Sequence, residues 1–361
     1  MTKLALARCA RPTLMRRSIS TYTMLGFTGY VVASVLGSVL AVVWELTLVE
    51  RFIGLLAPPL AFLVVVTVAS AIVGRERIVF YQTAFGGVIA TAVVAAIAGE
   101  RIARLVDLAT LGIGTFLVFG RIGCFAVACC HGTLGRGVVY GPDHVRLGFW
   151  ARWEGRSLWP VQLVESAASG VLVLIALAVG ASSPGAPAAI YIVGYGALRF
   201  TLELVRGDAA RPYVRGLSEA QWLALISVIA CAIWRPSPLT IGAAVSLAVA
   251  ATVLAARVRH RQLFQPSHLR ELDDRCLEAL GDPAHAGRAT SLGVALSCHA
   301  LPDGRLDWVL SSAHPAWSIT AARRIARALW RDHEVIAGRT SGVVHVVVPD
   351  EHTPEAAAGC G

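Results

Sequence analysis

Long apolar runs recur along the first 256 residues, and they limit the fold more than any other feature of the chain. They lie at residues 24–44, 52–73, 83–98, 108–130, 161–181, 188–205, 220–234 and 239–256. Most approach the roughly 20 residues that a helix needs to cross a bilayer. Since 56% of all residues are hydrophobic, 15% are charged and the mean hydropathy is +0.64, we predict an all-α polytopic membrane protein.

The last two apolar runs leave the number of transmembrane helices open at seven or eight. The sequence RPSP separates them at residues 235–238. Proline removes a backbone donor and disrupts a helix. The segment therefore predicts either a tight turn between two helices or one broken element.

Two further segments flank the membrane region at residues 24–256. Residues 1–23 are basic, and the apolar run after them lacks a convincing cleavage site, so we expect a retained helix rather than a signal peptide. From about residue 262 charged residues and histidine become frequent, which predicts a small soluble α+β domain at 262–361. Its expected elements are helices at 270–280 and 318–332, hairpin strands at 291–299 and 306–312, and a strand at 342–348.

The positive charge of the chain favours lipid rather than nucleic acid as a partner. A formal net charge of +9 is compatible with either. The arginines, however, are spread through short loops between apolar runs and do not form one soluble basic face. We predict contact with anionic membrane lipids and no nucleic acid.

Two arginines interrupt the apolar runs and mark a candidate anion site. Arg121 lies near the end of the fourth run and Arg199 lies inside the sixth. A guanidinium within a bilayer is expensive, so it usually faces a polar cavity or an anion, and its planar fork suits phosphate. Glu203 and Arg206 follow Arg199 on the same helical face, where the carboxylate can orient either guanidinium. We predict a site for a lipid headgroup phosphate.

A group of cysteines follows Arg121 closely. Cys124, Cys129 and Cys130 are followed directly by His131. Their spacing lacks the two-pair pattern typical of zinc and iron–sulfur sites. We therefore interpret them as small packed thiols, and we expect neither a metal ion nor a cofactor.

Three motifs occur in a characteristic order on this chain. They are GRIGCF at residues 120–125, WPVQLVE at 159–165 and YGALRFTLELVR at 195–206. In content, order and approximate spacing they resemble the prolipoprotein diacylglyceryl transferase family. Each motif alone is a weak signal, but three in order on a membrane protein are a stronger one. The resemblance covers about residues 25–235 and omits the C-terminal domain.

The resemblance implies an activity and a set of site residues. In that family, an enzyme of the bacterial inner membrane moves the diacylglyceryl group of phosphatidylglycerol to the lipobox cysteine thiol of a prolipoprotein and releases glycerol phosphate. It implies the same substrates here, a multi-pass inner-membrane location, and catalytic roles for Arg121, Arg199 and Glu203. The positions matching the motifs imply substrate contacts for Arg121, Arg206, Gln162, Glu165, Tyr195, Gly123 and Cys124.

The chain also departs from the family pattern. Phe85 and Trp159 stand where the family has histidine, and Val164 replaces a tyrosine. The residue usually proposed as the base for the thiol is therefore absent, and His131 is the expected acid or base in its place. The alternative is a catalytically silent relative that binds phospholipid or lipidated protein. A lipid or anion transporter is a third hypothesis, but the sequence has no visible inverted repeat.

Membrane orientation gives conflicting predictions. Counting Lys and Arg in the loops favours a cytoplasmic N-terminus. The resemblance implies an external N-terminus and external active-site loops, and we follow it because some loop arginines are expected to bind substrate. The C-terminal domain lies beyond all three motifs, so we expect it to serve recognition or regulation and to be dispensable for the chemistry.

Overall fold

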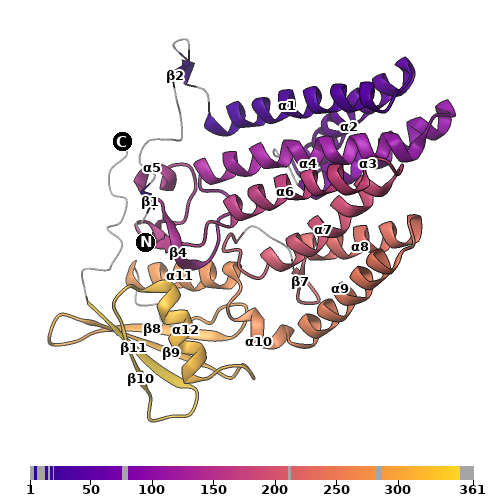
Figure 1. Ribbon diagram of the computed structural model, residues 1–361. Helices are drawn as coiled ribbons and strands as arrows, with labels where there is room; N and C mark the ends of the chain where they lie inside the picture. The colour runs from indigo at the N-terminus through magenta and orange to yellow at the C-terminus, as the bar shows by residue number, and fades with distance from the viewer. Residues whose placement is uncertain are drawn as a thin grey trace. The chain divides into compact units, whose positions relative to one another are not determined.

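Apolar helices make up the membrane region of the protein. The computed structural model describes residues 4–5, 13–14, 17–18, 20–74, 80–209, 213–281 and 287–349 (Figure 1). Within these residues six helices are long and apolar enough to cross a membrane, and α7 and α8 are apolar helices of 17 and 16 residues. The predicted polytopic fold is confirmed, but six described helices meet the length of a span where seven or eight were predicted, because α7 and α8 are shorter. The helices are α1 (Thr21–Val43), α2 (Leu48–Val73), α3 (Phe80–Ala98), α4 (Ile102–Ala126), α6 (Val161–Gly180), α7 (Ala186–Leu202), α8 (Glu219–Trp234) and α9 (Pro238–Ala256).

The last two membrane helices are separate, which settles the alternative left open by the RPSP segment. The turn between them is capped by Ser237 and Thr240. The backbone N–H of Thr240 donates to Ser237 Oγ at 3.2 Å, and the N–H of Ser237 donates to Thr240 Oγ1 at 3.0 Å. This reciprocal capping provides acceptors for backbone donors at the start of α9 and fixes a tight turn.

Helix α4, which carries the first motif, is the centre of the membrane region. It packs against α1, α2, α3, α6 and α7 (Figure 1). Inside the protein, 56% of its candidate span is buried, compared with 6% for α2. Large side chains on α2 such as Leu60, Leu63 and Ile72 remain exposed, as expected for side chains that contact lipid. The buried α4 therefore supplies a fixed frame for the polar residues at its end.

Asp107 ties the start of α7 to α4. Its carboxylate is fully buried and accepts hydrogen bonds from the backbone N–H groups of Gly185, at 2.7 Å, and Ala188, at 2.9 Å. Helix N-termini have unpaired donors and favour negative charge. Further along, a Cβ added at Gly114 would lie 2.6 Å from the ring of Tyr191, so glycine is needed for α4 and α7 to approach. These contacts set the position of α7 and of the arginine near its end.

Short backbone pairings connect the segments that follow α4 and α7. The N–H of Thr133 donates to the carbonyl of Val205 at 2.8 Å, and Gly132 pairs with Arg206 in an isolated antiparallel bridge. This pairing places Arg206 beside the segment that follows the first motif. The other elements here are β4 (Leu134–Val139), α5 (Pro142–Val145) and β5 (Ser157–Leu158), which is antiparallel to β4.

Little of the basic N-terminal segment expected at residues 1–23 falls within the described residues. Short strands β1 (Leu4–Ala5), β2 (Thr13–Leu14) and β3 (Arg17–Ser18) belong to it, and β1 is parallel to β4. The rest of the segment up to residue 19 lies outside the described residues. The basic character of this segment therefore stays a sequence observation.

The C-terminal region forms the expected small α+β fold. Its sheet has the strand order β10-β11-β9-β8 with every pair antiparallel. The predicted helices, hairpin and last strand are confirmed, whereas the short strand β10 was not anticipated because it has only four residues. The elements are α10 (Val258–Gln262), α11 (Pro266–Gly281), β8 (Val294–Ala300), β9 (Leu306–Ser312), α12 (Ile319–Leu329), β10 (Glu334–Ala337) and β11 (Val343–Val348).

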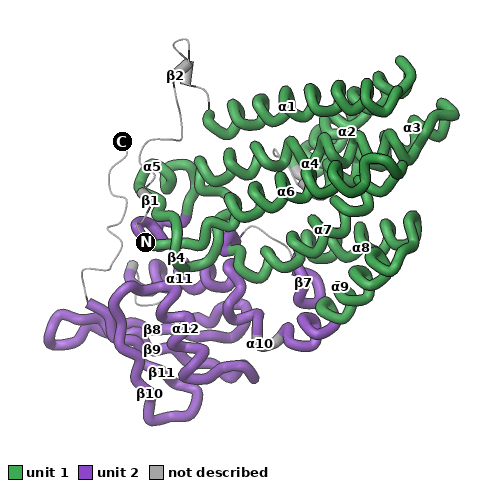
Figure 2. The backbone as a smooth tube through the Cα atoms, in the orientation of Figure 1, with its two compact units in different colours: residues 1–149, 157–206, 219–251 green, residues 150–156, 207–218, 252–361 purple. Residues whose placement is uncertain are grey.

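The chain divides into two compact units, shown in Figure 2. Unit 1 comprises residues 1–149, 157–206 and 219–251, and unit 2 comprises residues 150–156, 207–218 and 252–361. Unit 2 thus includes two segments from between the membrane helices, with η1 (Ala151–Trp153) and the hairpin strands β6 (Tyr213–Val214) and β7 (Leu217–Ser218). The functional division predicted at residue 262, and the dispensability of residues 262–361, stay predictions.

Asp273 of α11 holds one end of the 150–156 segment inside unit 2. Its carboxylate is buried and accepts from the indole N–H of Trp150 at 2.7 Å and from Nε of Arg152 at 2.7 Å. The guanidinium of Arg270 lies 4.9 Å over the Trp150 ring. A charged acceptor with two buried donors makes strong hydrogen bonds, so Asp273 fixes this segment to α11.

The end of α12 holds the other end of the same segment. The carbonyl of Ala328 accepts from the indole N–H of Trp153 at 3.0 Å and from Nη1 of Arg156 at 2.7 Å. Carbonyl groups in the last turn of a helix lack partners within it and favour positive charge nearby. Residues 150–156 therefore complete unit 2, because they provide the donors that α11 and α12 require.

Asp107→Ala should weaken the attachment of α7 to α4, because it removes the acceptor of two backbone N–H groups at the start of α7. Loss of a buried charged acceptor should lower the free energy of unfolding by about 1.5–3 kcal/mol, which thermal unfolding of the purified protein in detergent would measure. Asp143→Ala is the control, because Asp143 pairs only near the surface with Arg146 and its side chain is 45% exposed. An unfolding midpoint for Asp107→Ala equal to that of the control would contradict this account.

Asp273→Ala should loosen the 150–156 segment. The substitution leaves the buried N–H groups of Trp150 and Arg152 without their acceptor, and we expect a loss of about 1.5–3 kcal/mol together with faster proteolysis at residues 150–156. Limited proteolysis of the full chain, followed by mass spectrometry of the fragments, measures this. Asp274→Ala is the matched control, since Asp274 is the next residue of α11 and is exposed. Equal cleavage rates in the two variants would show that Asp273 does not hold the segment.

Candidate active site at the ends of α4, α6 and α7

Arg121 brings a buried positive charge to the last turns of α4. Only 5% of the residue is exposed, and its Nε lies 3.0 Å from Oε2 of Glu165 on α6. A buried guanidinium is tolerated only with a close countercharge and further hydrogen bonds. Glu165 supplies that countercharge, so the first and second motifs meet in space.

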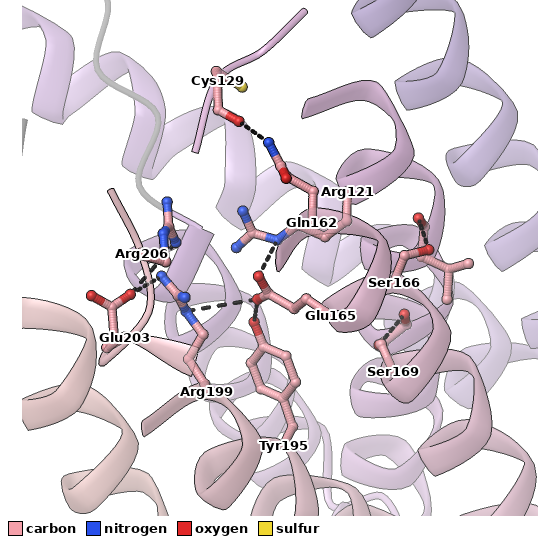
Figure 3. Close-up of polar contacts among 12 residues, drawn as sticks. Arg121, Cys129, Gln162, Glu165, Ser166, Ser169, Tyr195, Arg199, Glu203 and Arg206 are labelled. Atoms are coloured by element: carbon pink, nitrogen blue, oxygen red, sulfur yellow. Dashed lines mark hydrogen bonds and ion pairs between the residues drawn. The ribbon is translucent and has the colours of Figure 1, made fainter. Parts of the chain in front are cut away.

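Glu165 also connects to α7 (Figure 3). The hydroxyl of Tyr195 donates to its Oε1 at 2.6 Å, and Nε of Arg199 lies 3.7 Å from the same oxygen. One carboxylate therefore contacts residues of two helices, with Arg121 on one side and Arg199 on the other. The three predicted motifs converge on this residue, which was expected to line the site but not to be its centre.

Glu203 and Arg206 extend the cluster beyond α7. Nη2 of Arg199 lies 2.5 Å from Oε1 of Glu203, and Nη1 of Arg206 lies 3.5 Å from the same oxygen (Figure 3). Arg199 and Glu203 are four residues apart at the end of α7, which brings their side chains together. Arg206 was predicted on the same helical face, but α7 ends at Leu202, so Arg206 reaches Glu203 from the segment after the helix, where it pairs with Gly132. The predicted orienting position of Glu203 between two guanidinium groups agrees with this geometry.

The five charged residues of the cluster leave an excess of positive charge. Three arginines face two glutamates, and none of the five is more than 6% exposed. Within the described part of the chain, Nη1 of Arg199 is buried and has no hydrogen-bond partner. A buried donor without a partner costs free energy that an anionic acceptor would recover. The arrangement is therefore suited to bind an anion with several oxygen acceptors.

Gln162 fixes the turn that follows α4. Its Nε2 donates to the carbonyl of Cys129 at 2.8 Å (Figure 3). The same nitrogen lies 3.4 Å from the hydroxyl of Tyr140. Its Oε1 is buried and has no hydrogen-bond partner among the described residues. Gln162 thus holds the turn against α6 and keeps one acceptor available.

Stacked tyrosines lie beside the cluster. The rings of Tyr191 and Tyr195 are stacked with centroids 5.7 Å apart, and the ring of Tyr81 lies 5.9 Å from that of Tyr195. The hydroxyl groups of Tyr191 and Ser169 are 2.7 Å apart. Tyr81 and Tyr191 were not predicted from the sequence, although the spacing of four residues between Tyr191 and Tyr195 on one helix was a usable signal.

Two buried histidines lie in the segment after α4. Nδ1 of His131 lies 3.0 Å from the carbonyl of Gly132, and its ring packs edge-on against Phe149. His144 was not anticipated. It is 1% exposed, its ring centroid lies 4.9 Å from that of Tyr140, and neither of its ring nitrogens has a hydrogen-bond partner among the described residues. Because its buried ring nitrogens lack partners among the described residues, His144 is a second candidate acid or base beside His131.

The motif positions Gly123 and Cys124 lie where α4 ends. A Cβ at Gly123 would come 3.2 Å from the ring of Tyr22, so this glycine allows α1 to approach α4. Hydrogen bonds from the thiols of Cys124 and Cys129, together with the nearby Arg206, hold the pKa of Cys130 well below its ordinary value. The predicted substrate contacts of Gly123 and Cys124 stay predictions.

The residues at the three positions that depart from the family pattern are not proton donors or acceptors. Trp159, at a histidine position, is 49% exposed, and Val164, at the tyrosine position, is 47% exposed. Phe85, at the other histidine position, has its ring centroid 6.2 Å from that of Tyr81. None of these three side chains can accept or deliver a proton in solution chemistry near neutral pH. An acid or base for this site must come from other residues.

Comparison with known proteins agrees with the three motifs. The family model described as prolipoprotein diacylglyceryl transferase matches residues 12–235. The chain is 28% identical over 156 residues to phosphatidylglycerol--prolipoprotein diacylglyceryl transferase 2 of Clostridium perfringens, which covers 42% of this chain and 58% of that protein. It is 27% identical over 161 residues to the enzyme named phosphatidylglycerol--prolipoprotein diacylglyceryl transferase in Clostridium tetani, which covers 42% of this chain and 60% of the relative.

A third relative aligns over a shorter stretch. The protein of the same name from Paraburkholderia phymatum is 40% identical over 76 residues, or 20% of this chain and 25% of the relative. The chain thus matches at most 60% of the length of these curated relatives. The family match nevertheless covers more than half of the chain and includes Arg121, Arg199 and Arg206, so this chain belongs to the prolipoprotein diacylglyceryl transferase family.

Proposed function

We propose that the protein transfers the diacylglyceryl group of phosphatidylglycerol to the lipobox cysteine thiol of a prolipoprotein. The observation that carries the proposal is the buried cluster of three arginines and two glutamates, which has one excess positive charge. Family membership gives the reaction its substrates. The proposed location is the inner membrane of a bacterium, with the prolipoprotein signal peptide and membrane phospholipid as partners and no nucleic acid.

The reaction balances without a cofactor. The acceptor thiol loses its proton, and its sulfur attacks the glyceryl carbon that bears the phosphodiester oxygen. The carbon–oxygen bond breaks as the carbon–sulfur bond forms, which leaves a thioether on the acceptor and releases glycerol phosphate as a dianion. Negative charge grows on the phosphate during this step, so hydrogen-bond donors fixed around it lower the barrier most.

Arg121 and Arg199 are the proposed phosphate ligands. Both guanidinium groups are held by Glu165, and Nη1 of Arg199 is an available donor. The planar fork of arginine suits two phosphate oxygens at once. Arg206, which pairs with Glu203, adds a third positive charge beside the phosphate. Gln162 and Tyr195 would position the headgroup or the residues that bind it. The proposed substrate contacts of Gly123 and Cys124 are with the same lipid.

The proton of the acceptor thiol needs a destination. A thiol with an ordinary pKa near 8.5 is only a few per cent ionised at neutral pH. The positive cluster would favour the thiolate electrostatically, and buried His131 or His144 would accept the proton. The rival proposal is a catalytically silent relative that binds phospholipid. It rests on Phe85 and Trp159 at the positions of the family histidines.

Arg121→Ala and Arg199→Ala should each reduce transfer by about 10²–10³-fold, as removal of one fixed donor does in other reactions through anionic transition states. The assay uses the full chain in phosphatidylglycerol vesicles and follows the mass gain of a lipobox peptide. Lysine at either position should restore little, because it lacks the fork. Arg146→Ala is the matched control, since Arg146 is exposed and forms a surface ion pair with Asp143.

The outcomes separate the two proposals. Near wild-type transfer by both alanine variants, with normal insertion, would exclude the phosphate role of the cluster. No transfer by the unmodified protein, combined with arginine-dependent binding to phosphatidylglycerol vesicles, would favour the silent relative.

Glu165→Gln should lower the transfer rate by displacing Arg121 and Arg199. The change keeps the shape but removes the countercharge, so Arg121 and Arg199 repel each other and shift. We expect kcat to fall by about 10–100-fold, with a smaller change in KM, because a positioning residue orients groups used in the transition state. Glu165→Asp should restore part of the rate. Glu45→Gln, which removes an exposed carboxylate after α1, is the control. A variant with unchanged kcat would show that Glu165 does not position the arginines.

A further inference from the structure

We propose that Cys124, Cys129 and Cys130 form a binding site for one thiophilic metal ion of the class of Zn²⁺ or Cu⁺. The proposal does not depend on the transfer reaction, and its test measures bound metal rather than activity. The fold, rather than the sequence spacing, supports it, because the spacing alone lacks the two-pair pattern of familiar sites.

The three sulfur atoms lie close to the positions that ligands of one metal ion would take. They all lie within 4.8 Å of one another. A tetrahedral zinc ion with bonds of about 2.3 Å to sulfur holds its sulfur ligands roughly 3.8 Å apart. The sulfur atoms therefore have to approach by at most about 1 Å, which small side-chain rotations can supply without unfolding the turn. Three sulfur ligands leave one position of a tetrahedral ion open.

The backbone that carries these cysteines is fixed in advance. Cys124 belongs to the last turn of α4, and the carbonyl of Cys129 is held by Nε2 of Gln162 at 2.8 Å. Ala128 and Cys130 have φ values of 58° and 55°, in the left-handed region that residues with side chains seldom adopt. Such a conformation persists only when the surroundings maintain it, and it is concentrated at functional sites. The turn is therefore rigid at the place where the thiols converge.

Access and charge also suit a metal ion. Cys124 is buried, but Cys129 and Cys130 are half-buried, so an ion has a route to the sulfur atoms. Thiolates select soft ions such as Zn²⁺ and Cu⁺ over harder ones. Three thiolates carry more negative charge than either ion neutralises, and Arg121, one turn before Cys124 on α4, places a positive charge on the neighbouring turn.

The test measures metal bound by the full-length protein. The chain is purified in detergent under reducing conditions, incubated with Zn²⁺ or with Cu⁺, desalted, and analysed for metal by plasma mass spectrometry. We expect about one ion per chain, and we expect Cys124→Ser, Cys129→Ser or Cys130→Ser each to lower the affinity by about tenfold or more. Cys231→Ser is the matched control, because Cys231 is a buried free cysteine on α8.

Alkylation gives a second measurement that does not need variants. In the unmodified protein, bound metal should protect the three thiols from alkylation, and a chelator should remove that protection while Cys231 is unaffected. The proposal fails if wild-type protein holds no more Zn²⁺ or Cu⁺ than a triple serine variant. It also fails if mass spectrometry of protein isolated without added oxidant finds two of the three cysteines joined in a disulfide.

Discussion

The centre of this membrane protein depends on the ion pairs that the carboxylate of Glu165 forms with two arginines. It stands between Arg121, with 3.0 Å from Nε to Oε2, and Arg199, with 3.7 Å from Nε to Oε1. Two guanidinium groups at such depth would repel by several kcal/mol without an anion between them, since charges a few ångströms apart interact by about 4 kcal/mol even at an effective dielectric constant near 20. Glu165 therefore allows α4, α6 and α7 to converge, and it does so with residues from all three motifs.

The two glutamates of the cluster do not neutralise all of its arginines. A second carboxylate, Glu203, lies between Arg199 and Arg206, so three cations share two anions. If every arginine had its own carboxylate, the cluster would be neutral and would attract an external anion only weakly. One positive charge of the cluster is not neutralised, and a buried donor on Arg199 lacks a partner among the described residues, so the cluster favours an external anion. The glutamates stabilise the arginines and the remaining charge attracts the anion, which is the physical basis of the proposed phosphate site.

The sequence predicted the helices because bilayer spans need long apolar runs, and it predicted Arg121 and Arg199 because charge in such runs is costly. Glu203 followed from helical spacing, whereas Arg206 lies beyond the end of α7 and reaches Glu203 from the next segment. Long-range packing was not accessible in this way. Nothing local marks His144, Tyr81 or the central role of Glu165, since their importance comes from neighbours many residues away. The converging sulfur atoms of the cysteine turn depend likewise on left-handed backbone that residue types do not signal.

Unit 2 shows how a segment of a membrane region can depend on residues far along the chain. Residues 150–156 obtain their buried partners from α11 and α12, through Asp273 and the carbonyl of Ala328. The same segment is continuous with β5, which is followed within a few residues by Gln162 and Glu165. β5 is itself held by its antiparallel pairing with β4, and the N–H of Trp159 donates to the carbonyl of Thr133 at 3.0 Å. The expected role of the C-terminal region in recognition or regulation therefore stays a prediction, and the chain between residues 150–156 and α6 is one physical route for it.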